Sequence, residues 1–483
     1  MLHGKLLKQR NLLRQPALHV EHLEPRLYLT AAPEFLPGEV LVQYEANATP
    51  QDREAIRGLV EAALKQEIHT RAMQAAGVGV LDRVQLPGNM PVQAAIQMFQ
   101  NHPHVVVAEP NYVITTAAVS NDPGYINGSL WGMESDDSPV DIGPAGTTNL
   151  YGSQAEEAWY AGATGSSSIY VGIIDEGFQY THPDLVNNAW TNPIEANGVA
   201  GVDDDGNGYV DDIYGWDFFS NDNTPYDGTG DDHGTHVAGT IGAEGGNGLG
   251  VAGVNWDVTM ISAKFLGPSG GYTSGAIQAV DYITDLKILH NIDIIATNNS
   301  WGGGGFSSLL EAAIIRGANE DILFIAAAGN NSSNIDASVY YPASYSTSSP
   351  QDANNTPASY EAVVAVASIT STGGLSSFSN YGATRVDLGA PGSSIYSTLP
   401  TDTYGTYSGT SMATPHVTGA AALFASQYSQ GSRPTGEEIR NALLQSAVPT
   451  PSLDGITVTG GRLDVNAALA LANPPGLDVS ITP

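Results

Sequence analysis

Hydrophobic positions follow two different patterns along the chain. Between residues 33 and 117, short alternating stretches are separated by stretches with helical spacing. From about residue 118 onward, apolar runs of strand length recur between longer helical segments. A strand that is apolar at every position is buried on both faces, as in a parallel sheet, whereas alternation marks one solvated face. The pattern therefore predicts a small α/β domain followed by a larger one built on a parallel sheet.

The small domain is predicted to alternate strands with helices. Residues 38–44 alternate as a strand, and Thr49 with Pro50 supplies a helix cap and a first-turn proline before apolar positions that recur from residue 55 to residue 64. A strand at 78–86, a helix at 91–100 and a strand at 104–114 follow. This order approximates a split βαβ unit, so we expect an α+β, ferredoxin-like domain.

The larger domain carries a series of buried strands, with helical patterns at 274–290 and 307–319 between them. The apolar runs lie at residues 168–177, 259–267, 292–302, 321–330 and 361–369. Alternation of such strands with helices predicts a doubly wound parallel sheet covered on both faces. In these sheets the site lies beyond the carboxyl ends of the strands, which here carry Asp175, Ser300 with Gly302, and Asn330.

The two ends of the chain differ from the rest. Residues 1–32 begin with a basic stretch, and no apolar run follows that is long enough for a usual signal-peptide core or a membrane span. Residues 22–31, HLEPRLYLTA, resemble the LEPR-type N-terminal motif of surface and extracellular proteins of some bacteria. We therefore expect a targeting leader at 1–32, and a proline-rich tail at 473–483.

Charge and cysteine content exclude several classes of function. The chain has 50 acidic against 17 basic side chains, a formal net charge of -33, and no cysteine. Nucleic acids and anionic membranes would repel such a chain, whereas cations would be attracted. Saline surroundings or simple solubility each account for this balance. The lack of cysteine excludes disulfides, thiolate zinc sites and a cysteine nucleophile.

Residues 407–422, YSGTSMATPHVTGAAA, hold the strongest candidate for catalysis. A Gly-Thr-Ser turn leads into small and apolar residues, which predicts a helix with Ser411 at its first turn and Pro415 in that same turn. The unpaired N–H groups and the dipole of a helix N-terminus favour negative charge beside the hydroxyl. Serine alone is a poor nucleophile, so a base and an orienting acid are required elsewhere.

Both groups occur upstream. Asp175 ends a buried strand pattern, and His233 stands at the start of a helix in DHGTHVAG. The blocks GTSMATPH and HGTHVAG, with the strand-ending aspartate, resemble the signature blocks of the subtilisin-like serine peptidases (subtilases). The resemblance implies a triad of Asp175, His233 and Ser411, with Asn330 as an oxyanion donor. The chain departs from the family at Glu176, where a small Ser, Thr or Asp is usual.

The same resemblance implies a place for the substrate. Ser300, Trp301 and Gly302 would form an edge that pairs with the extended substrate backbone, with Trp301 beside the pocket. The sequence PASY occurs at 342–345 and again at 357–360, and either copy could form the pocket wall. The second histidine of the HGTHVAG block, His236, is structural in the family.

The small domain resembles the inhibitory prodomain of subtilases through PGEVLV and AEPNY. That resemblance implies a zymogen whose residues 33–117 assist folding, occupy the cleft as an intramolecular inhibitor, and are cut off ahead of a peptidase domain at 118–472. A retained accessory domain is the alternative. The implied enzyme is a secreted or cell-surface monomer acting on proteins or peptides.

Calcium is the expected cofactor. The acidic run at 203–212, DDDGNGYVDD, offers oxygen ligands at alternate positions around a glycine, as calcium loops do. Its predicted ligands are Asp203, Asp205, Asn207 and Asp211. Tyr214 occupies the twelfth position, where an EF-hand has glutamate, so a shorter loop is expected. A solvated acidic loop is the alternative.

The family resemblance implies two further calcium sites. The stronger match comprises Asp122, Asp184 and Asn247 with the carbonyls of Leu249 and Val251. The less complete match comprises Asp217 and Asp222.

The sequence argues against two other classes of protein. A catalytically silent surface or binding protein could retain the same fold, but the intact set of catalytic residues argues against it. An esterase on an α/β-hydrolase fold would need its nucleophile in G-x-S-x-G and the order Ser, acid, His, whereas Ser411 stands in GTSMA and the order here is Asp, His, Ser.

Overall fold

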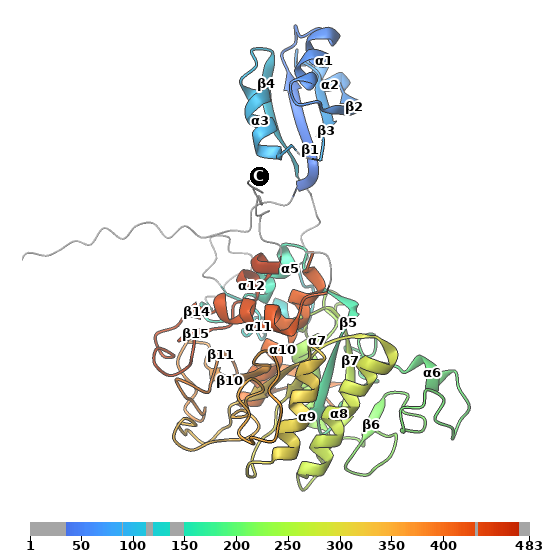
Figure 1. The fold of residues 1–483 in the computed structure, drawn as a ribbon, viewed down its shortest axis with the longest axis vertical. Helices are drawn as coiled ribbons and strands as arrows, with labels where there is room; N and C mark the ends of the chain where they lie inside the picture. The colour runs from blue at the N-terminus through green and yellow to red at the C-terminus, as the bar shows by residue number, and fades with distance from the viewer. Residues whose placement is uncertain (1–34, 89, 113–118, 136–148, 430–432, 473–483) are drawn as a thin grey trace, which may run out of the picture. The chain divides into compact units, whose positions relative to one another are not determined.

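A computed structural model describes residues 35–88, 90–112, 119–135, 149–429 and 433–472 (Figure 1). The chain divides into two compact units, an N-terminal unit that ends at Tyr112 and a C-terminal unit that begins at Val113. The leader predicted at 1–32 and the tail predicted at 473–483 lie outside the described residues. No helix in the described part is long and apolar enough to cross a membrane.

The N-terminal unit is a four-stranded antiparallel sheet with the order β2-β3-β1-β4. Its strands are β1 (Phe35–Tyr44), β2 (Ala63–Ile68), β3 (Leu81–Gln85) and β4 (Val105–Tyr112). Its helices are α1 (Pro50–Gly58), α2 (Arg71–Ala75) and α3 (Val92–Gln100). Buried side chains of β1, β3, β4, α1 and α3, among them Tyr44, Ile56 and Phe99, form one core. The α+β expectation is confirmed.

Helix α1 begins where the sequence predicts and ends earlier. Thr49 accepts from the backbone N–H of Asp52, and the Asp52 side chain accepts from the Thr49 backbone, so the cap is reciprocal. The helix stops at Gly58, and β2 takes up residues 63–68, so the prediction of a helix to residue 64 is wrong. Glycine is a weak helix former, and Leu64 pairs instead with Val84 of β3.

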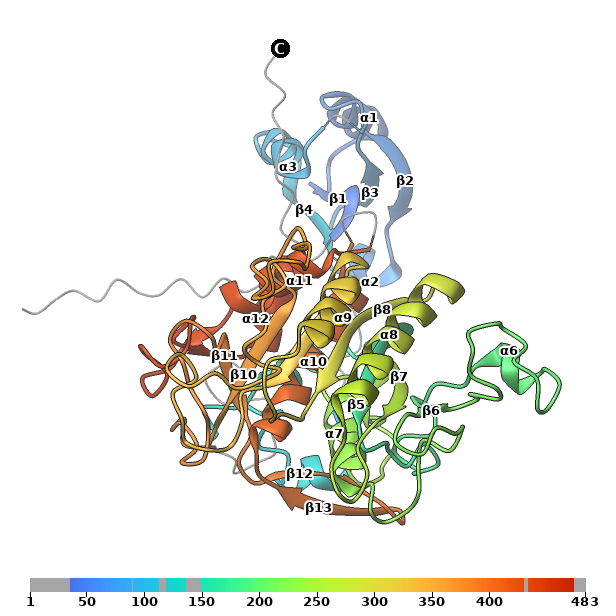
Figure 2. The same cartoon turned by 60° about the horizontal axis from the view of Figure 1, so that its bottom comes forward.

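The C-terminal unit contains a nine-stranded sheet with the order β14-β15-β11-β10-β9-β8-β5-β7-β6. Its strands are β5 (Gly165–Asp175), β6 (Gly215–Asp217), β7 (Asp257–Lys264), β8 (Asp293–Asn299), β9 (Leu323–Ala327), β10 (Val363–Ile369), β11 (Leu388–Pro391), β14 (Val448–Pro449) and β15 (Gly461–Arg462). Every neighbouring pair is parallel except β14 with β15. A separate hairpin joins β12 (Ile395–Leu399) to β13 (Thr403–Tyr407), and Figure 2 shows it beside α7.

Helices cover both faces of this sheet. They are α4 (Pro123–Ile126), α5 (Ala155–Tyr160), α6 (Pro193–Ala196), α7 (Asp232–Gly242), α8 (Thr273–His290), α9 (Ser308–Asn319), α10 (Thr410–Gln427), α11 (Gly436–Gln445) and α12 (Val465–Ala472). On β5, Val171 and Ile173 belong to the core shared with α7 and α10, whereas Ile174 belongs to the core shared with α8 and α9. Figure 1 shows α8 and α9 lying side by side. The expectation of a doubly wound parallel sheet is confirmed.

The sheet order brings the predicted site residues to one edge. Strands β5, β8 and β9 are consecutive neighbours, and Asp175, Ser300 and Asn330 lie at or just after their carboxyl ends. His233 is the second residue of α7, and Ser411 is the second residue of α10. Parallel strands end at the same edge, so five segments far apart in the sequence deliver their side chains to one region.

Candidate active site

Asp175 and His233 form a direct hydrogen bond. The Asp175 side chain is fully buried, and its Oδ1 lies 2.9 Å from His233 Nδ1. Because a carboxylate only accepts, the shared hydrogen sits on Nδ1, and Nε2 remains available as a base. The His233 side chain is 30% exposed, so this second nitrogen can be reached from the cavity that the ring lines.

The surrounding charges make His233 more basic than usual. Burial by itself lowers the pKa of His233, but the Asp175 carboxylate, its hydrogen bond, and the charges of Glu176 and Asp232 outweigh burial and raise it to about 9. A cationic imidazole is therefore stabilised at this position. That is the form the ring takes after it accepts a proton.

Ser411 is held by a reciprocal pair of hydrogen bonds with Ser300. Ser411 Oγ donates to the Ser300 carbonyl at 2.9 Å, and Ser300 Oγ donates to the Ser411 carbonyl at 2.9 Å. Pro415 lies in the second turn of α10, because the helix begins at Thr410, so its predicted place in the first turn is wrong. Its missing N–H leaves the Ser411 carbonyl free for Ser300.

Asn330 is fixed beside the start of α10. Its Oδ1 accepts from the Thr410 backbone N–H at 2.9 Å and from Thr410 Oγ1 at 3.0 Å. A Cβ built on Gly409 would lie 3.5 Å from Asn330 Nδ2 and 3.6 Å from the Ser411 backbone nitrogen. Glycine at 409 therefore leaves open a space that two N–H donors border.

A cavity of about 580 Å³ adjoins these groups. Glu176 and His233 line it together with Ser300, Trp301 and Gly302. Further aromatic lining comes from Phe265, Tyr272, Tyr341 and Tyr345. The Trp301 ring packs edge-on against Phe265, with the ring centroids 4.9 Å apart. The cavity is thus a cleft with apolar walls and polar groups at the end where His233 lies.

The structure separates the two PASY copies. Pro342 and Tyr345 of the first copy line the cavity. Tyr360 of the second copy is buried in the core shared with α7 and α10, where its hydroxyl approaches Gly436. The first copy therefore forms the wall of this cleft.

His236 has a structural environment. Its side chain is fully buried, its Nε2 lies 2.9 Å from the Ile395 carbonyl, and its ring stacks on Tyr407. Burial lowers the pKa of His236 to about 4. The ring is therefore neutral at physiological pH and joins α7 to the β12–β13 hairpin.

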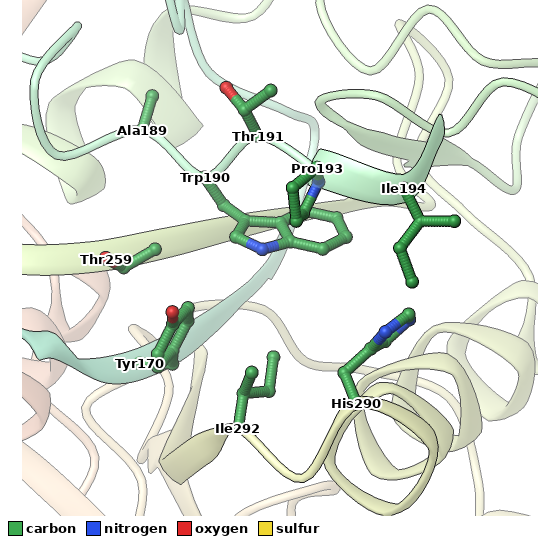
Figure 3. Close-up of a pocket in the computed structure, with 9 residues that line it drawn as sticks. All are labelled: Tyr170, Ala189, Trp190, Thr191, Pro193, Ile194, Thr259, His290 and Ile292. Carbon is green, nitrogen blue, oxygen red and sulfur yellow. The ribbon is translucent and has the colours of Figure 1, made fainter. Parts of the chain in front are cut away.

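A second cavity, of about 440 Å³, lies away from this site, beside β5 and the C-terminal end of α8 (Figure 3). Figure 3 shows the Trp190 indole, the Tyr170 ring and His290 converging on it, with Ile194 and Ile292 alongside. Its lining includes no carboxylate. His290 pairs with Asp205, Nε2 to Oδ2 at 3.0 Å, but the lining includes none of the predicted catalytic residues, so we assign the chemistry to the first cavity.

The strongest predicted calcium ligands come together on one loop. Asp122 accepts from the backbone N–H groups of Gly246 and Gly248 at 2.7 and 2.9 Å. Asp184 Oδ1 accepts from the Asn247 amide at 2.8 Å, and Asp184 Oδ2 accepts from the Val251 N–H at 3.0 Å. Both carboxylates are fully buried. Asn247 Oδ1 accepts from the Leu249 N–H at 2.7 Å, so the side chains of Asp122, Asp184 and Asn247 all bond to or lie within this loop, whereas Leu249 and Val251 contact them through N–H groups and not through the predicted carbonyls.

The acidic loop gathers a different set of ligands from the predicted one. Oxygen atoms of Glu195, Asp203 and Asp205 all lie within 4.8 Å of one another. Asn207 donates its amide to Asp205 Oδ2 at 3.2 Å, whereas the Asp211 carboxylate accepts from the Gly201 N–H at 2.7 Å. Glu195 lies outside the acidic run, so the pattern of that run did not indicate it.

Asp217 and Asp222 face each other at the end of β6. Their backbones exchange hydrogen bonds at 2.8 and 3.1 Å. Asp217 Oδ1 accepts from two backbone N–H groups, while its buried Oδ2 has no hydrogen-bond partner among the described residues. A bound cation would pair with this oxygen. Asp217 therefore offers the kind of carboxylate ligand that the less complete predicted calcium site needs.

Comparisons with known proteins agree with this arrangement. The family model described as "Subtilase family" matches residues 166–469, and the one described as "Fervidolysin N-terminal prodomain" matches residues 29–111. The chain is 33% identical to the thermophilic serine proteinase of Bacillus sp. (strain AK1) over 86% of this chain and 82% of that protein. It is 37% identical to thermitase of Thermoactinomyces vulgaris over 57% of this chain and 80% of that protein.

More distant similarity has the same character. The chain is 33% identical to subtilisin-like protease 1 of Plasmodium falciparum, over 62% of this chain and 43% of that protein. Among solved structures, proteases from Pseudoalteromonas arctica PAMC 21717 match with a TM-score of 0.53 and 26% identity, over 74% of this chain and 100% of theirs. The chain therefore belongs to the subtilase family of serine endopeptidases and carries a prodomain ahead of its peptidase domain.

Proposed function

We propose that this subtilase cleaves peptide bonds through Ser411, His233 and Asp175, with Asn330 assisting. The observation that carries the proposal is the hydrogen bond from His233 Nδ1 to Asp175, at the edge of the sheet where Ser411 lies in the first turn of α10. Asp175 holds the imidazole in the tautomer whose free Nε2 can act as a base, and it stabilises the cation that results.

Catalysis begins when the Ser411 hydroxyl changes partner. A hydroxyl has one hydrogen, which Ser411 now gives to the Ser300 carbonyl. Rotation toward His233 Nε2 lets the imidazole take this proton while Oγ attacks the substrate carbonyl carbon. The imidazolium then gives the proton to the leaving amine, and an acyl-enzyme remains. Water, deprotonated by the same imidazole, attacks the ester and releases the acid product.

Negative charge on the carbonyl oxygen would be stabilised in the space over Gly409. The Ser411 backbone N–H and the Asn330 amide border that space. Both donors are fixed before the reaction, the first by α10 and the second by its two hydrogen bonds from Thr410. Donors oriented in advance stabilise a developing oxyanion with little reorganisation.

The substrate would lie extended along residues Ser300, Trp301 and Gly302, which follow β8. Backbone groups beyond the strand end can pair with a peptide as an added strand. The aromatic walls of the cleft then receive apolar substrate side chains. Proteins or peptides are therefore the proposed substrates.

The N-terminal unit is proposed to inhibit the enzyme and to be removed by it. The prodomain match and the compact core of this unit support a zymogen that processes itself. We propose that the mature enzyme is a monomer that acts outside the cell, either secreted or at the cell surface. A peptidase kept inactive by its own prodomain until processing is suited to export.

Calcium is the proposed cofactor, and its role is to stabilise the fold. The ion would supply positive charge to carboxylates that repel one another in a chain of net charge -33. The residues that would hold it are Asp122, Asp184, Asn247, Leu249 and Val251 at the first site; Glu195, Asp203, Asp205 and Asn207 at the second; and Asp217 and Asp222 at the third. Asp211, whose Oδ2 accepts from the Gly201 N–H, would add its other carboxylate oxygen to the second site.

A serine-directed phosphonate tests the proposed function. Purified protein is incubated with the reagent, and the adduct is mapped by mass spectrometry. We expect modification at Ser411 and its loss in the His233→Ala variant, which lacks the base. An unmodified Ser411 in folded, processed protein would identify a catalytically silent relative instead.

A further inference from the structure

Glu176 uses all three of its polar groups around the proposed catalytic pair. Its backbone N–H donates to Asp175 Oδ1 at 2.8 Å. Its side-chain Oε1 accepts from the backbone N–H of His233 at 2.5 Å. Its carbonyl accepts from Lys264 Nζ at 2.5 Å. The residue after the proposed catalytic acid is therefore bound to that acid, to the base, and to the neighbouring strand β7.

The contact with His233 fills a gap at the start of α7. The N-cap residue of this helix, Asp231, makes no side-chain cap hydrogen bond. Its carboxylate instead accepts from Lys264 Nζ at 2.6 Å and from the Asp227 N–H at 2.6 Å. The first turn of a helix leaves its N–H groups unpaired, and Glu176, the residue that follows β5, supplies the missing acceptor.

His233 is consequently held twice by the same strand end. Asp175 holds its ring through Nδ1, and Glu176 holds its backbone. A shift of α7 relative to β5 would break both contacts at once. The Ser, Thr or Asp that subtilases usually have at this position has a shorter side chain than Glu176.

The charges around Glu176 are mostly negative. Asp175 precedes it as the last residue of β5, Asp232 lies on α7 and accepts from the Tyr407 hydroxyl, and His233 faces it from the same helix. Lys264 of β7 is the nearby cation, and it is shared with Asp231 and, at 3.4 Å, with Asp227. Burial and then the charge of Asp175 raise the pKa of Glu176 to about 7. Above that pH its negative charge adds to those that favour a cationic His233.

We propose that Glu176 is a positioning residue for the peptidase reaction: its carboxylate anchors the backbone of His233, and its charge stabilises the imidazolium that forms when Ser411 attacks. This rests on the proposed function of His233 and Ser411. It accounts for a half-buried glutamate beside the proposed catalytic acid, at a position where subtilases usually have a small Ser, Thr or Asp.

Three substitutions separate the hydrogen bond from the charge. Glu176→Gln keeps the length and an acceptor oxygen but removes the charge. Glu176→Asp keeps the charge but shortens the reach to the His233 N–H. Glu176→Ala removes both. Glu437→Gln, which alters a first-turn acid of α11, is the matched control. The measurement is kcat and KM of the processed enzyme on an uncharged peptide between pH 5 and 10, with thermal unfolding of each variant.

In the Glu176→Gln variant we expect the midpoint of the acidic limb of the kcat/KM profile to shift to lower pH by at least about half a unit. The reason is that a neighbouring anion no longer favours the protonated imidazole of His233. We expect the plateau kcat to fall by up to about threefold with KM unchanged, since half a unit in the pKa of the base limits the loss of rate to about that factor. Glu176→Asp should keep the acidic limb at the same pH as the wild type and should have a lower kcat. Glu176→Ala should show both changes.

The inference is overturned if Glu176→Gln and Glu176→Asp both match the wild type in limb and kcat. It is also overturned if only KM changes, because Glu176 would then contact substrate. Any variant that fails to process itself is cleaved by added wild-type enzyme and then labelled with the phosphonate. If the phosphonate does not label the wild type, the proposed catalytic role of Ser411 is wrong. That result would leave the contacts of Glu176 unaffected.

Discussion

Ser300 and Ser411 bind each other twice, each hydroxyl donating to the other residue's carbonyl at 2.9 Å, although they are 111 positions apart in the sequence. The exchange joins the substrate edge after β8 to the first turn of α10. Pro415 makes it possible, because a proline four residues after Ser411 leaves the Ser411 carbonyl without its helical partner. The proposed nucleophile is therefore positioned by the segment that is proposed to hold its substrate.

The first prediction concerns this exchange. Ser300→Ala should lower stability by about 1 kcal/mol, since it leaves the Ser411 carbonyl unpaired. It should also lower kcat, because the start of α10 is no longer tied to β8. Pro415→Ala restores an N–H for the same carbonyl, so the double variant should lose less stability than the two single changes added together. Urea unfolding of the four proteins checks this, and strict additivity would contradict it.

Asn330 provides the second prediction. Asn330→Ala should reduce kcat by about 10² to 10³ with little change in KM, the usual effect of removing one oxyanion donor. Asn330→Asp is the control for structure, because it keeps the acceptor oxygen that Thr410 uses and loses only the donor. It should be at least as slow as the alanine variant. An aspartate variant with near-normal kcat would show that Asn330 acts only by anchoring α10.

The third prediction is a pH dependence of stability. The pKa of His233 is raised to about 9 from an ordinary value of 6.5, so its charged form stabilises the folded protein. This contribution is complete below about pH 6.5 and is lost as the pH rises through 9. The pKa values of Glu176 and Asp212 are raised to about 7, so these two groups change the free energy of unfolding mainly below pH 7. The change in stability between pH 7 and pH 9 therefore comes mainly from His233. Thermal midpoints of Ser411→Ala should fall across this interval, and those of Ser411→Ala/His233→Asn should fall less.

Maturation gives the fourth prediction. Ser411→Ala should remain uncut, because a prodomain removed in cis requires the molecule's own nucleophile. The wild type should lose an N-terminal piece that ends between about Thr115 and Asn121, a region that lies partly outside the described residues. Mass spectrometry of both proteins from a protease-deficient host decides this. Equal trimming of the two would show that another peptidase does the processing.

The fifth prediction concerns calcium. A ligand that binds only the folded state adds RT ln(1 + [L]/Kd), about 2.7 kcal/mol at a hundredfold excess over Kd. Chelator should therefore lower the thermal midpoint of Ser411→Ala, and calcium should restore it. Sodium chloride at matched ionic strength should restore less, because screening replaces no bound ion.

Single substitutions assign the effect to a site. Asp184→Asn should reduce the calcium response of the first site and Glu195→Gln that of the second, whereas Asp454→Asn, an exposed acid elsewhere, should leave the response intact. If sodium chloride recovers the midpoint as fully as calcium does, the acidic residues form only a solvated surface.

Local structure was readable from the sequence because its causes are local. The alternating stretch at 38–44 became β1, Thr49 and Pro50 started α1, and the apolar run ending at Asp175 became β5. Helix ends were less accurate. The apolar spacing around residues 55–64 resembled a helix, but Leu64 gains a strand partner in Val84. That partner lies 20 positions away and is invisible to a helical pattern.

Contacts between distant segments depended on the path of the backbone. The sequence named Asp175, His233, Ser411 and Asn330 through resemblance to a family, but their distances come from the order of the strands. It also offered two PASY copies without a choice, and the fold placed the first in the cleft and the second in the core.

The sequence by itself determined the two domains, the doubly wound sheet and the family, because apolar periodicity and short motifs are properties of neighbouring residues. Only the tertiary structure decided that Glu195 joins Asp203 and Asp205, that Ser300 holds Ser411, and that Glu176 holds His233. Each of these contacts is a meeting of side chains from separate elements. Their distances are fixed by how the elements pack, which no local pattern specifies.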